Sequence, residues 1–508
     1  MFTLSIFVAA LSLFAFYWAA TWVYNVFFHP LKSYPGPKLY AASGIPMLFW
    51  KLKGQLPYKI KELHDRYGDV VRVAPRYLDY SSSTAWEEIY GFPKDGKGNF
   101  PKDLKERGGP MQAINIINAG PEDHRRFRRL QAHAFSEKSL ASQEPLIQDY
   151  AQQFVDGLIR FSATDDTIDL GRWYNFATFD LIGDLAFGEP FDCLKTGVMH
   201  SWIALIFSLF EIVVIISELR KYPTVGSLLM LLIPPKMRNR FINHKKLAAQ
   251  KAERRMATVT DRPDFMTYIM RHNETEKGMT PDEIKENASI LIIAGSETTA
   301  SLLHGLTYFL LRSPSVLQNL TMELRTTFKT RSDLTLQALA SCKYLNAVLE
   351  EGLRMYPPVP GNLPRMAPPE GTVIEGKYVP GRTTIGVHNW TANYSTSNFA
   401  DPYKFHPERW LSSEDVSKLE STFPGMQLGD PTQFENDDRK ARQTFSYGPA
   451  NCIGKNLAYA EMRLLLGIVV WGFDLEAGEG ADTWLERNKV YGLWKKPPLN
   501  VKLTRVNV

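Results

Sequence analysis

Cysteine is scarce in this chain of 508 residues, which contains only Cys193, Cys342 and Cys452. Because the number is odd and no CxxC pair occurs, the sequence excludes a disulfide framework and a cysteine-rich zinc site. No GxGxxG motif follows a predicted strand, so no dinucleotide or flavin site of the chain's own is expected. The net charge of +5 is spread along the sequence and does not favour a nucleic-acid partner.

Acidic and basic side chains are absent from Phe2 to Phe28. At 1.5 Å per residue, a helix of this length exceeds a hydrocarbon core of about 30 Å. No basic residue precedes the apolar run, and no small-residue cleavage site follows it, so we predict a retained transmembrane anchor (residues 1–28) instead of a signal peptide. Lysines occur only after the run, which predicts a lumenal N-terminus and a cytosolic body.

Residues 29–40 are proline-rich, and we interpret them as a stiff hinge because proline fixes φ. Residues 41–508 contain no repeat, no low-complexity tract and no long linker. The body is therefore predicted to be one large, mainly α domain with small β-sheets. Helical patterns cover residues 123–137, 143–161, 173–187, 200–219, 234–255, 342–355 and 455–471, extended patterns cover 70–73, 77–80 and 383–387, and 398–442 reads as irregular.

The longest helical pattern runs from Asp282 to Leu311. Thr280, Pro281 and Glu283 form a capping-box signature at its start. Its centre is apolar on all sides, so this helix is predicted to cross the interior of the domain.

A polar motif, Ala294-Gly295-Ser296-Glu297-Thr298-Thr299, interrupts that apolar centre. An acid there is costly unless it is paired. The small residues would let a large group approach the backbone, and the Thr298 hydroxyl is expected to bond the Ala294 carbonyl. Taken alone, the motif is equally consistent with a kinked helix whose hydroxyls are satisfied.

The second motif is Phe-Ser-Tyr-Gly-Pro-Ala-Asn-Cys-Ile-Gly at residues 445–454, directly before the last helix. A cysteine at a helix N-terminus has its thiolate favoured by backbone N–H groups, and Gly448 and Gly454 would let the backbone turn toward the sulfur. Taken alone, an inert buried cysteine is also consistent, and that is the expectation for Cys193 and Cys342. Glu351 and Arg354 share a helix face, and Arg409 in a later irregular segment could join them.

In this order and spacing, the motifs resemble the cytochrome P450 family of haem-thiolate monooxygenases over the whole chain. The hinge and the central helix look most like membrane-anchored fungal members of secondary metabolism. The resemblance implies that Cys452 is the axial thiolate of haem iron. It further implies three groups of supporting residues: Phe445, Gly448 and Gly454 beneath the haem; Glu297 and Thr298 in proton delivery to bound dioxygen; and Glu351, Arg354 and Arg409 in a structural triad. His124, Arg128 and Arg365 are the implied contacts of the haem propionates.

The implied activity is the insertion of one oxygen atom from O₂ into a lipophilic small molecule. The cofactor would be haem b, with electrons from NADPH supplied by a separate flavoprotein reductase at the endoplasmic reticulum membrane. One departure is Ala450, where the family usually has a basic residue that pairs with a propionate. This change predicts weaker haem retention or a shifted potential.

Two alternatives stay open at this point. One is a haem-thiolate isomerase or dehydratase that does not use O₂, although the presence of Glu297 and Thr298 argues against it. The other is a non-enzymatic anchored haem protein, to which Ala450 lends some support.

Overall fold

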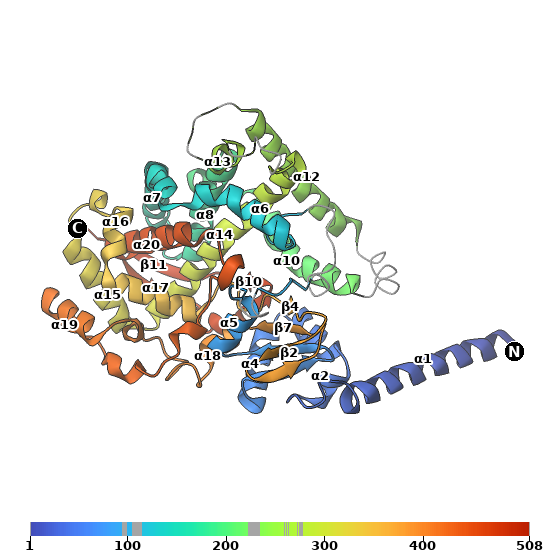
Figure 1. Ribbon diagram of the computed structural model, residues 1–508. Helices are drawn as coiled ribbons and strands as arrows, with labels where there is room; N and C mark the ends of the chain where they lie inside the picture. The colour runs from blue at the N-terminus through green and yellow to red at the C-terminus, as the bar shows by residue number, and fades with distance from the viewer. Residues whose placement is uncertain are drawn as a thin grey trace.

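The structure is a computed structural model that describes residues 2–93, 99–103, 114–221, 234–258, 260, 262, 264–271, 273 and 278–506. As predicted, its described part is mainly helical with small sheets, and a single long helix extends from it at the N-terminus (Figure 1). The helices of the first half are α1 (Phe2–Phe27), α2 (Lys38–Ala42), α3 (Ile45–Leu52), α4 (Leu56–Tyr67), α5 (Ser83–Tyr90), α6 (Pro121–Ala132), α7 (Glu137–Ser162), α8 (Leu170–Phe187), α9 (Cys193–Thr196), α10 (Ser201–Arg220) and α12 (Pro235–Ala257).

The second half continues with α13 (Phe265–Arg271), α14 (Pro281–Leu311), α15 (Pro314–Thr327), α16 (Leu336–Ser341), α17 (Lys343–Met355), α18 (Asn389–Tyr394), α19 (Ser413–Thr422) and α20 (Lys455–Gly472). The strands are β1 (Val70–Ala74), β2 (Tyr77–Tyr80), β3 (Ile168–Asp169), β4 (Arg365–Met366), β5 (Thr372–Ile374), β6 (Lys377–Val379), β7 (Thr384–Val387), β8 (Phe473–Ala477), β9 (Lys489–Tyr491), β10 (Leu493–Lys495) and β11 (Asn500–Arg505).

The described strands form four small sheets. The largest has the strand order β1-β2-β7-β4, with β2 and β7 parallel, and a second has the order β3-β11-β8. β9 and β10 form an antiparallel hairpin, as do β5 and β6. The four-stranded sheet contains Arg365 in β4, which lines the cavity of the candidate site. The β9–β10 hairpin ends at Lys495 and leads into the segment that begins at Lys496.

Helix α14 crosses the interior of the domain, as its sequence predicts. The capping box is present: Thr280 accepts from the backbone N–H of Glu283, and the Glu283 carboxylate accepts from the N–H of Thr280. α14 packs closely along α8, and a Cβ at Gly295 would lie 2.6 Å from the Ile182 side chain. A larger residue at position 295 would therefore have to displace the Ile182 side chain or separate the two helices.

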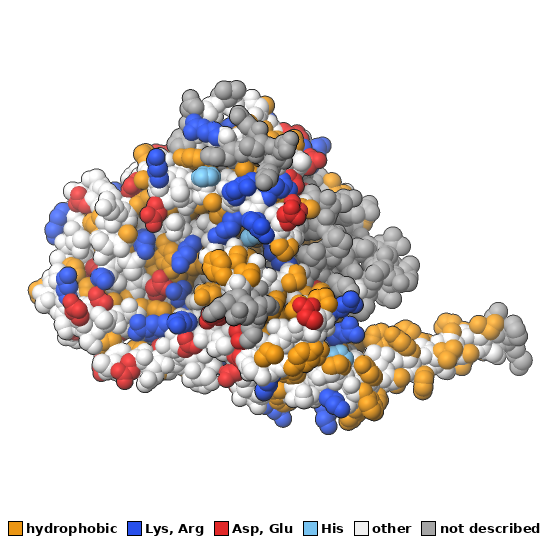
Figure 2. All heavy atoms as spheres, in the orientation of Figure 1, with side chains coloured by type: hydrophobic (Ala, Val, Ile, Leu, Met, Phe, Trp, Pro, Cys, Tyr) orange, Lys and Arg blue, Asp and Glu red, His pale blue; other side chains and the backbone are white. Residues whose placement is uncertain are grey.

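Helix α1 projects from the body, and Leu4–Phe27 is long and apolar enough to cross a membrane (Figure 1). The space-filling view shows exposed apolar side chains along the described part of this projection (Figure 2). The segment after it is not a free spacer, because Leu31 is buried and the Pro35 carbonyl accepts from the N–H of Arg72 in β1 at 2.7 Å. A Cβ at Gly36 would lie 2.5 Å from the Arg72 carbonyl oxygen, so this segment is packed tightly against β1.

Two expectations about local structure were wrong. The range 398–442 is not irregular throughout, because a capping box formed by Ser412 and Asp415 starts α19. The basic helix stops at Ala132 instead of continuing to 137, because Ser136 caps a new helix, α7, by accepting from the N–H of Ser139. Short polar capping signals decided both boundaries.

Candidate active site

The loop before α20 presents the Cys452 thiol. The N–H of Cys452 donates to the Phe445 carbonyl at 2.8 Å, which closes the loop. Gly448 has φ +70°, and a Cβ there would lie 2.1 Å from the Tyr90 carbonyl oxygen, so only glycine fits. Gly454 differs, because its Cβ would meet Phe135 and the Cys452 sulfur at ordinary distances of 3.8 and 4.0 Å. Gly454 is thus placed beside the sulfur, as its predicted role requires, without being sterically obligatory.

Cys452 is an exposed residue, whereas Cys193 and Cys342 are buried. Surrounding protein atoms raise the pKa of Cys452 by desolvation, and the Gly454 N–H, Arg128 and Lys455 pull it back down. The Gly454 N–H lowers the pKa of Cys452, as predicted for a backbone donor at the sulfur. Desolvation by the surrounding protein is the larger effect, so the pKa of the thiol is raised overall. Burial raises the pKa of Cys193 and of Cys342 to about 12, consistent with inert thiols.

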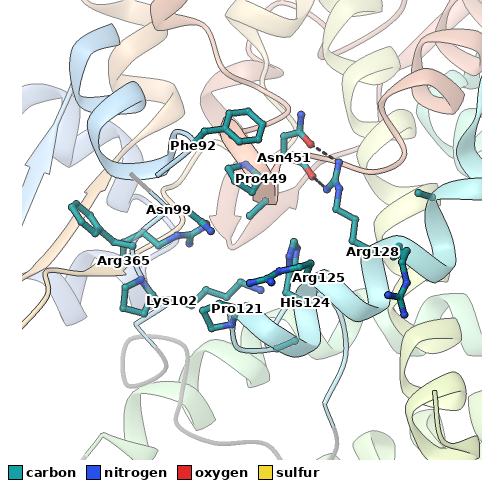
Figure 3. Close-up of a pocket in the computed structure, with 17 residues that line it drawn as sticks. Phe92, Asn99, Lys102, Pro121, His124, Arg125, Arg128, Arg365, Pro449 and Asn451 are labelled. Atoms are coloured by element: carbon teal, nitrogen blue, oxygen red, sulfur yellow. Dashed lines mark hydrogen bonds between the residues drawn. The ribbon is translucent and has the colours of Figure 1, made fainter. Parts of the chain in front are cut away.

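A cavity of about 520 Å³ opens between α6 and the cysteine loop (Figure 3). It brings together the predicted residues His124, Arg128 and Arg365, together with Gly448. Its described lining consists of Phe92, Asn99, Phe100, Pro101, Lys102, Ala119, Pro121, His124, Arg125, Arg128, Arg129, Ala132, Arg365, Gly448, Pro449, Ala450 and Asn451. Five of these side chains are cationic and none is acidic, so the cavity is suited to an anionic group.

Arg365 is the most deeply buried of these cations, with 2% of its surface exposed. It donates to the Leu363 carbonyl at 3.2 Å and lies over the Tyr90 ring at 4.9 Å, and its Nε has no partner among the described residues. A buried guanidinium without a carboxylate is costly, which points to an anion supplied by a ligand. Desolvation and the nearby Lys102, Arg128 and Arg365 lower the pKa of His124 to about 4, so His124 is neutral near pH 7.

Lys102 is a lining residue that the sequence reasoning missed. Its backbone forms an isolated antiparallel bridge with Arg365, and its Nζ donates to the Ile116 carbonyl at 3.0 Å. Only its charge distinguishes it in the sequence, and no motif surrounds it. Ala450, the departure noted above, lines the same cavity. Lys102, which lies outside every recognised motif, therefore adds a positive charge to this cavity. Position 450, where a basic residue was expected, contributes none.

The centre of α14 has two different faces. Thr298 donates to the Ala294 carbonyl at 2.6 Å, as predicted, and Ala294 is exposed in the middle of an otherwise interior helix. Glu297 is completely buried on another face, where its Oε1 is bonded to Lys496 and accepts from Ser301 at 3.1 Å. No hydrogen bond joins the carboxylate of Glu297 to the hydroxyl of Thr298 among the described contacts. Lys496 was not identified from the sequence.

A second acid near α14 also escaped the sequence reasoning. Glu461 of α20 is buried, neither of its carboxyl oxygens has a hydrogen-bond partner among the described residues, and burial raises its pKa to about 8 while nearby Thr299 offsets part of the rise. A signal existed, because Glu461 falls between Leu457 and Leu464 on an apolar helix face.

Glu351 and Arg354 form a buried bidentate ion pair. The Nε and an Nη of Arg354 donate to Glu351 at 2.9 and 2.7 Å. Arg409 lies 3.4 Å from Glu351 but is in closer contact with Asp437, which the sequence reasoning did not include. The predicted trio is therefore brought together, with Asp437 as an additional member.

This charge cluster is connected to the segment that leads into the cysteine loop. The Thr444 hydroxyl donates to the Leu353 carbonyl at 3.0 Å, and Arg442 pairs with Glu350. Phe445 packs on Tyr459 of α20, with ring centroids 5.3 Å apart. Helix α17 thus holds the polypeptide directly before the loop.

The fold and this site define a helical protein with an exposed cysteine beside a cation-lined cavity. The cytochrome P450 family model matches residues 35–503, and the chain belongs to that family. It is 42% identical over 482 residues to cytochrome P450 monooxygenase aclL of Aspergillus oryzae, covering 95% of this chain and 94% of that protein.

Two further relatives give the same result. The identity is 42% over 488 residues to cytochrome P450 monooxygenase astA of Talaromyces wortmannii, with 96% of this chain and 94% of that protein covered. It is 39% over 487 residues to trichothecene C-15 hydroxylase of Fusarium sporotrichioides, with 95% and 94% covered. The family and these relatives identify the protein as a P450 monooxygenase, a haem-thiolate enzyme that receives its electrons from a redox partner.

The described residues fit a haem. Its anionic propionates match a cavity with five cationic and no acidic described lining residues. An exposed cysteine residue beside Gly454 matches a thiolate iron ligand.

Proposed function

We propose that the protein inserts one oxygen atom from O₂ into a lipophilic small molecule of fungal secondary metabolism, as a membrane-anchored enzyme. The observation that carries the proposal is the exposed residue Cys452, which directly follows Asn451 in the lining of a cavity that collects Arg128, Arg365 and His124 without a described acidic lining residue. Haem b, when bound, supplies the oxygen-activating chemistry. The names of relatives, a trichothecene hydroxylase among them, support the substrate class.

In this proposal Cys452 would hold the haem iron through its thiolate. Phe445, Gly448 and Gly454 shape the loop beneath the haem, and Gly448 keeps that loop against the Tyr90 carbonyl. Arg128 and Arg365 hold the propionates through charge, and neutral His124 contributes a hydrogen bond.

Two residues of α14, Glu297 and Thr298, would take part in proton delivery. Thr298 donates its only hydroxyl proton to the Ala294 carbonyl, so its oxygen would be left to accept a hydrogen bond from a proton donor such as water and to orient that donor. Glu297 is the proton source next to it in sequence. Glu351, Arg354 and Arg409 act structurally, because they stabilise the helix that holds the segment before Cys452.

The domain organisation follows from the same reasoning. Residues 1–28 anchor the protein, residues 29–40 connect the anchor to the body, and residues 41–508 form the haem domain. The exposed apolar helix α1 supports an anchor, and lysines on its C-terminal side favour a cytosolic catalytic domain at the endoplasmic reticulum. Electrons would come from NADPH through a separate flavoprotein reductase in the same membrane.

Of the two alternatives, the non-enzymatic haem protein is disfavoured by relatives named monooxygenase and hydroxylase. The isomerase or dehydratase is disfavoured by the same names and by the Thr298 hydroxyl on the exposed centre of α14.

The test is the difference spectrum of the reduced, carbon-monoxide-bound protein in membranes, compared between wild type, Cys452→Ser and Cys342→Ser. We expect the red-shifted Soret band of a thiolate-ligated haem in wild type and in Cys342→Ser, and its loss in Cys452→Ser. If wild type binds haem with a neutral-ligand band, or if Cys452→Ser keeps the thiolate band, the assignment of the ligand is wrong.

Product formation is tested separately. Membranes that contain a fungal P450 reductase, NADPH and ¹⁸O₂ are incubated with a panel of terpenoid and polyketide precursors. Incorporation of one ¹⁸O atom into a product supports oxygen insertion. A product without ¹⁸O would instead favour the isomerase or dehydratase alternative.

A further inference from the structure

A buried polar stripe runs along α14, beginning one turn after Ala294. Glu297, Ser301 and His304 are spaced four and three residues apart, so they lie on one side of the helix. Lys496, in the segment directly after β10, reaches this stripe from outside the helix. Its Nζ is bonded to Oε1 of Glu297 and lies 2.6 Å from the Ser301 hydroxyl.

The contact between Lys496 and Glu297 is a buried ion pair. The Lys496 side chain is 6% exposed and that of Glu297 is 0% exposed. Burial of a lone carboxylate disfavours its charge, and an adjacent ammonium group favours it. Desolvation raises the pKa of Glu297. Lys496 lowers it and offsets part of this rise, and Ser301 makes a smaller contribution in the same direction.

The other titratable groups around Glu297 do not replace Lys496. His304 is buried, neither of its ring nitrogens has a partner among the described residues, and its pKa lies well below the usual value because of desolvation and Lys496. Tyr356, at the end of α17, donates its hydroxyl proton to Asn488 at 2.8 Å, and its pKa is raised by burial. Both groups are therefore neutral, and Lys496 is the cation that faces Glu297.

The two oxygens of Glu297 are in different situations. Oε1 carries both polar contacts, to Lys496 and to Ser301. Oε2 is buried and has no partner among the described residues. Oε2 is therefore the oxygen on which a proton can be taken up and released while Lys496 keeps the carboxyl group in place.

We propose that Lys496 is a positioning residue that holds Glu297 on its own buried side of α14, about 100° around the helix from Thr298, and leaves Oε2 as its proton-carrying atom. The inference deepens the proposed function, on whose assignment of Glu297 as the proton source it rests. Successive residues of an α-helix point about 100° apart, so the ion pair must loosen before Glu297 can serve the face that carries Thr298. Lys496 would thus control both the protonation state of the Glu297 carboxyl group and the side of α14 toward which this group points.

The first experiment measures the protonation of Glu297 in the haem-loaded protein. Infrared difference spectra between successive pH values report the carbonyl stretch of a protonated carboxyl group, and comparison with Glu297→Gln identifies the band of this residue. In Lys496→Met we expect the midpoint of that band to rise by roughly 1–3 pH units, because an adjacent opposite charge has been removed. Lys496→Arg, which keeps the charge, should return the midpoint toward the wild-type value.

The matched control is the neighbouring lysine. Lys495 pairs with Glu211 at the surface, where the two side chains are 60% and 42% exposed. Lys495→Met should leave the Glu297 midpoint unchanged. A midpoint that stays at the wild-type pH in Lys496→Met, or that moves equally in Lys495→Met, would overturn the inference.

A second measurement applies if Lys496→Met does not fold. Removal of one partner leaves an uncompensated buried charge, whereas removal of both partners does not. The double variant Glu297→Gln/Lys496→Met should therefore recover the yield and melting temperature that Lys496→Met loses. A double variant that is as unstable as Lys496→Met would contradict the pairing.

The carbon-monoxide spectrum separates this inference from the proposed function. A thiolate-ligated haem together with an unchanged Glu297 midpoint in Lys496→Met would reject only the role of Lys496. A shifted midpoint in a protein without thiolate-ligated haem would support the ion pair and reject the proposed haem ligation.

Discussion

Arg128 donates one hydrogen bond to the carbonyl oxygen and another to the side-chain oxygen of Asn451, both at 2.5 Å (Figure 3). Asn451 directly precedes Cys452, so this fork connects the cation-bearing helix α6 to the cysteine loop. The planar guanidinium can make both bonds at once, which an ammonium group cannot reproduce. The residue proposed to hold a propionate is therefore also the residue that fixes the loop of the proposed iron ligand.

The first prediction concerns this fork. Arg128→Lys keeps the charge but loses the paired hydrogen bonds, and we expect haem affinity to fall roughly 10-fold or more, as for other residues that orient a metal ligand. The measurement is the haem-to-protein ratio after transfer to apomyoglobin. Arg160→Lys on the exposed side of α7 is the control and should behave as wild type. Equal haem retention in Arg128→Lys would show that charge alone is sufficient.

The second prediction concerns Ala450, which lines the cavity where the family usually has a basic residue. Ala450→Arg should slow haem loss, because one additional charge-assisted hydrogen bond contributes about 1.5–3 kcal/mol, or roughly tenfold or more in the rate of haem loss. The rate of haem transfer to apomyoglobin measures the effect. Faster loss in Ala450→Arg would mean that repulsion from the cations already present, Lys102 and Arg365 among them, outweighs the new bond.

The sequence was most informative where local chemistry determines structure. The capping box at Thr280 and Glu283, the bond from Thr298 to Ala294 and the pairing of Glu351 with Arg354 all join residues three or four positions apart. Such contacts follow from helix geometry alone, so they could be predicted without knowledge of the fold.

Contacts between distant segments could not be predicted in this way. Lys496 is almost 200 residues from Glu297, and Lys102 reaches Arg365 through a single β-bridge. Neither lysine lies in a recognisable motif, and each acquires its place only when separate elements pack together. The net pKa of Cys452 depends on packing in the same way, because desolvation by surrounding protein atoms outweighs the local effect of the Gly454 N–H.

The third prediction concerns the buried charge cluster on α17. Besides its two bonds to Glu351, Arg354 donates to the carbonyls of Asn393 and Pro402, each at 2.8 Å, and to that of Lys404 at 3.2 Å. Arg354→Met leaves Glu351 without its main cation in the interior, which costs about 3–5 kcal/mol of unfolding free energy. Urea denaturation followed by tryptophan fluorescence measures the change.

Arg354→Lys tests whether charge alone stabilises the cluster. An ammonium group has three donors in place of five, so we expect it to recover only part of the loss. The control is Lys404→Met, because the Lys404 ammonium pairs with Asp401 at the surface and should contribute little. If Arg354→Lys is as stable as wild type, the carbonyl contacts add no net stability.

The last prediction concerns the pH dependence of stability through Glu461. Its pKa is raised from 4.5 to about 8 in the folded protein, so between these values the folded state binds more proton than the unfolded state. Stability from this group is therefore complete below pH 4.5 and is lost as the pH rises through 8, by roughly 4–5 kcal/mol at most. Glu461→Gln removes the ionisation, and its melting temperature relative to wild type should rise steadily from pH 5 to pH 8.5.

Differential scanning calorimetry over this pH range measures how the difference in melting temperature between Glu461→Gln and wild type changes with pH. The cost of burying the amide of glutamine does not depend on pH, so it does not affect this slope. Glu414→Gln, at an exposed position in the first turn of α19, is the control and should show no change of slope. Parallel curves for wild type and Glu461→Gln would mean that Glu461 is ionised throughout the range. Thr299, which already offsets part of the pKa rise, would then have to stabilise the charge more strongly, because neither carboxyl oxygen has a hydrogen-bond partner among the described residues.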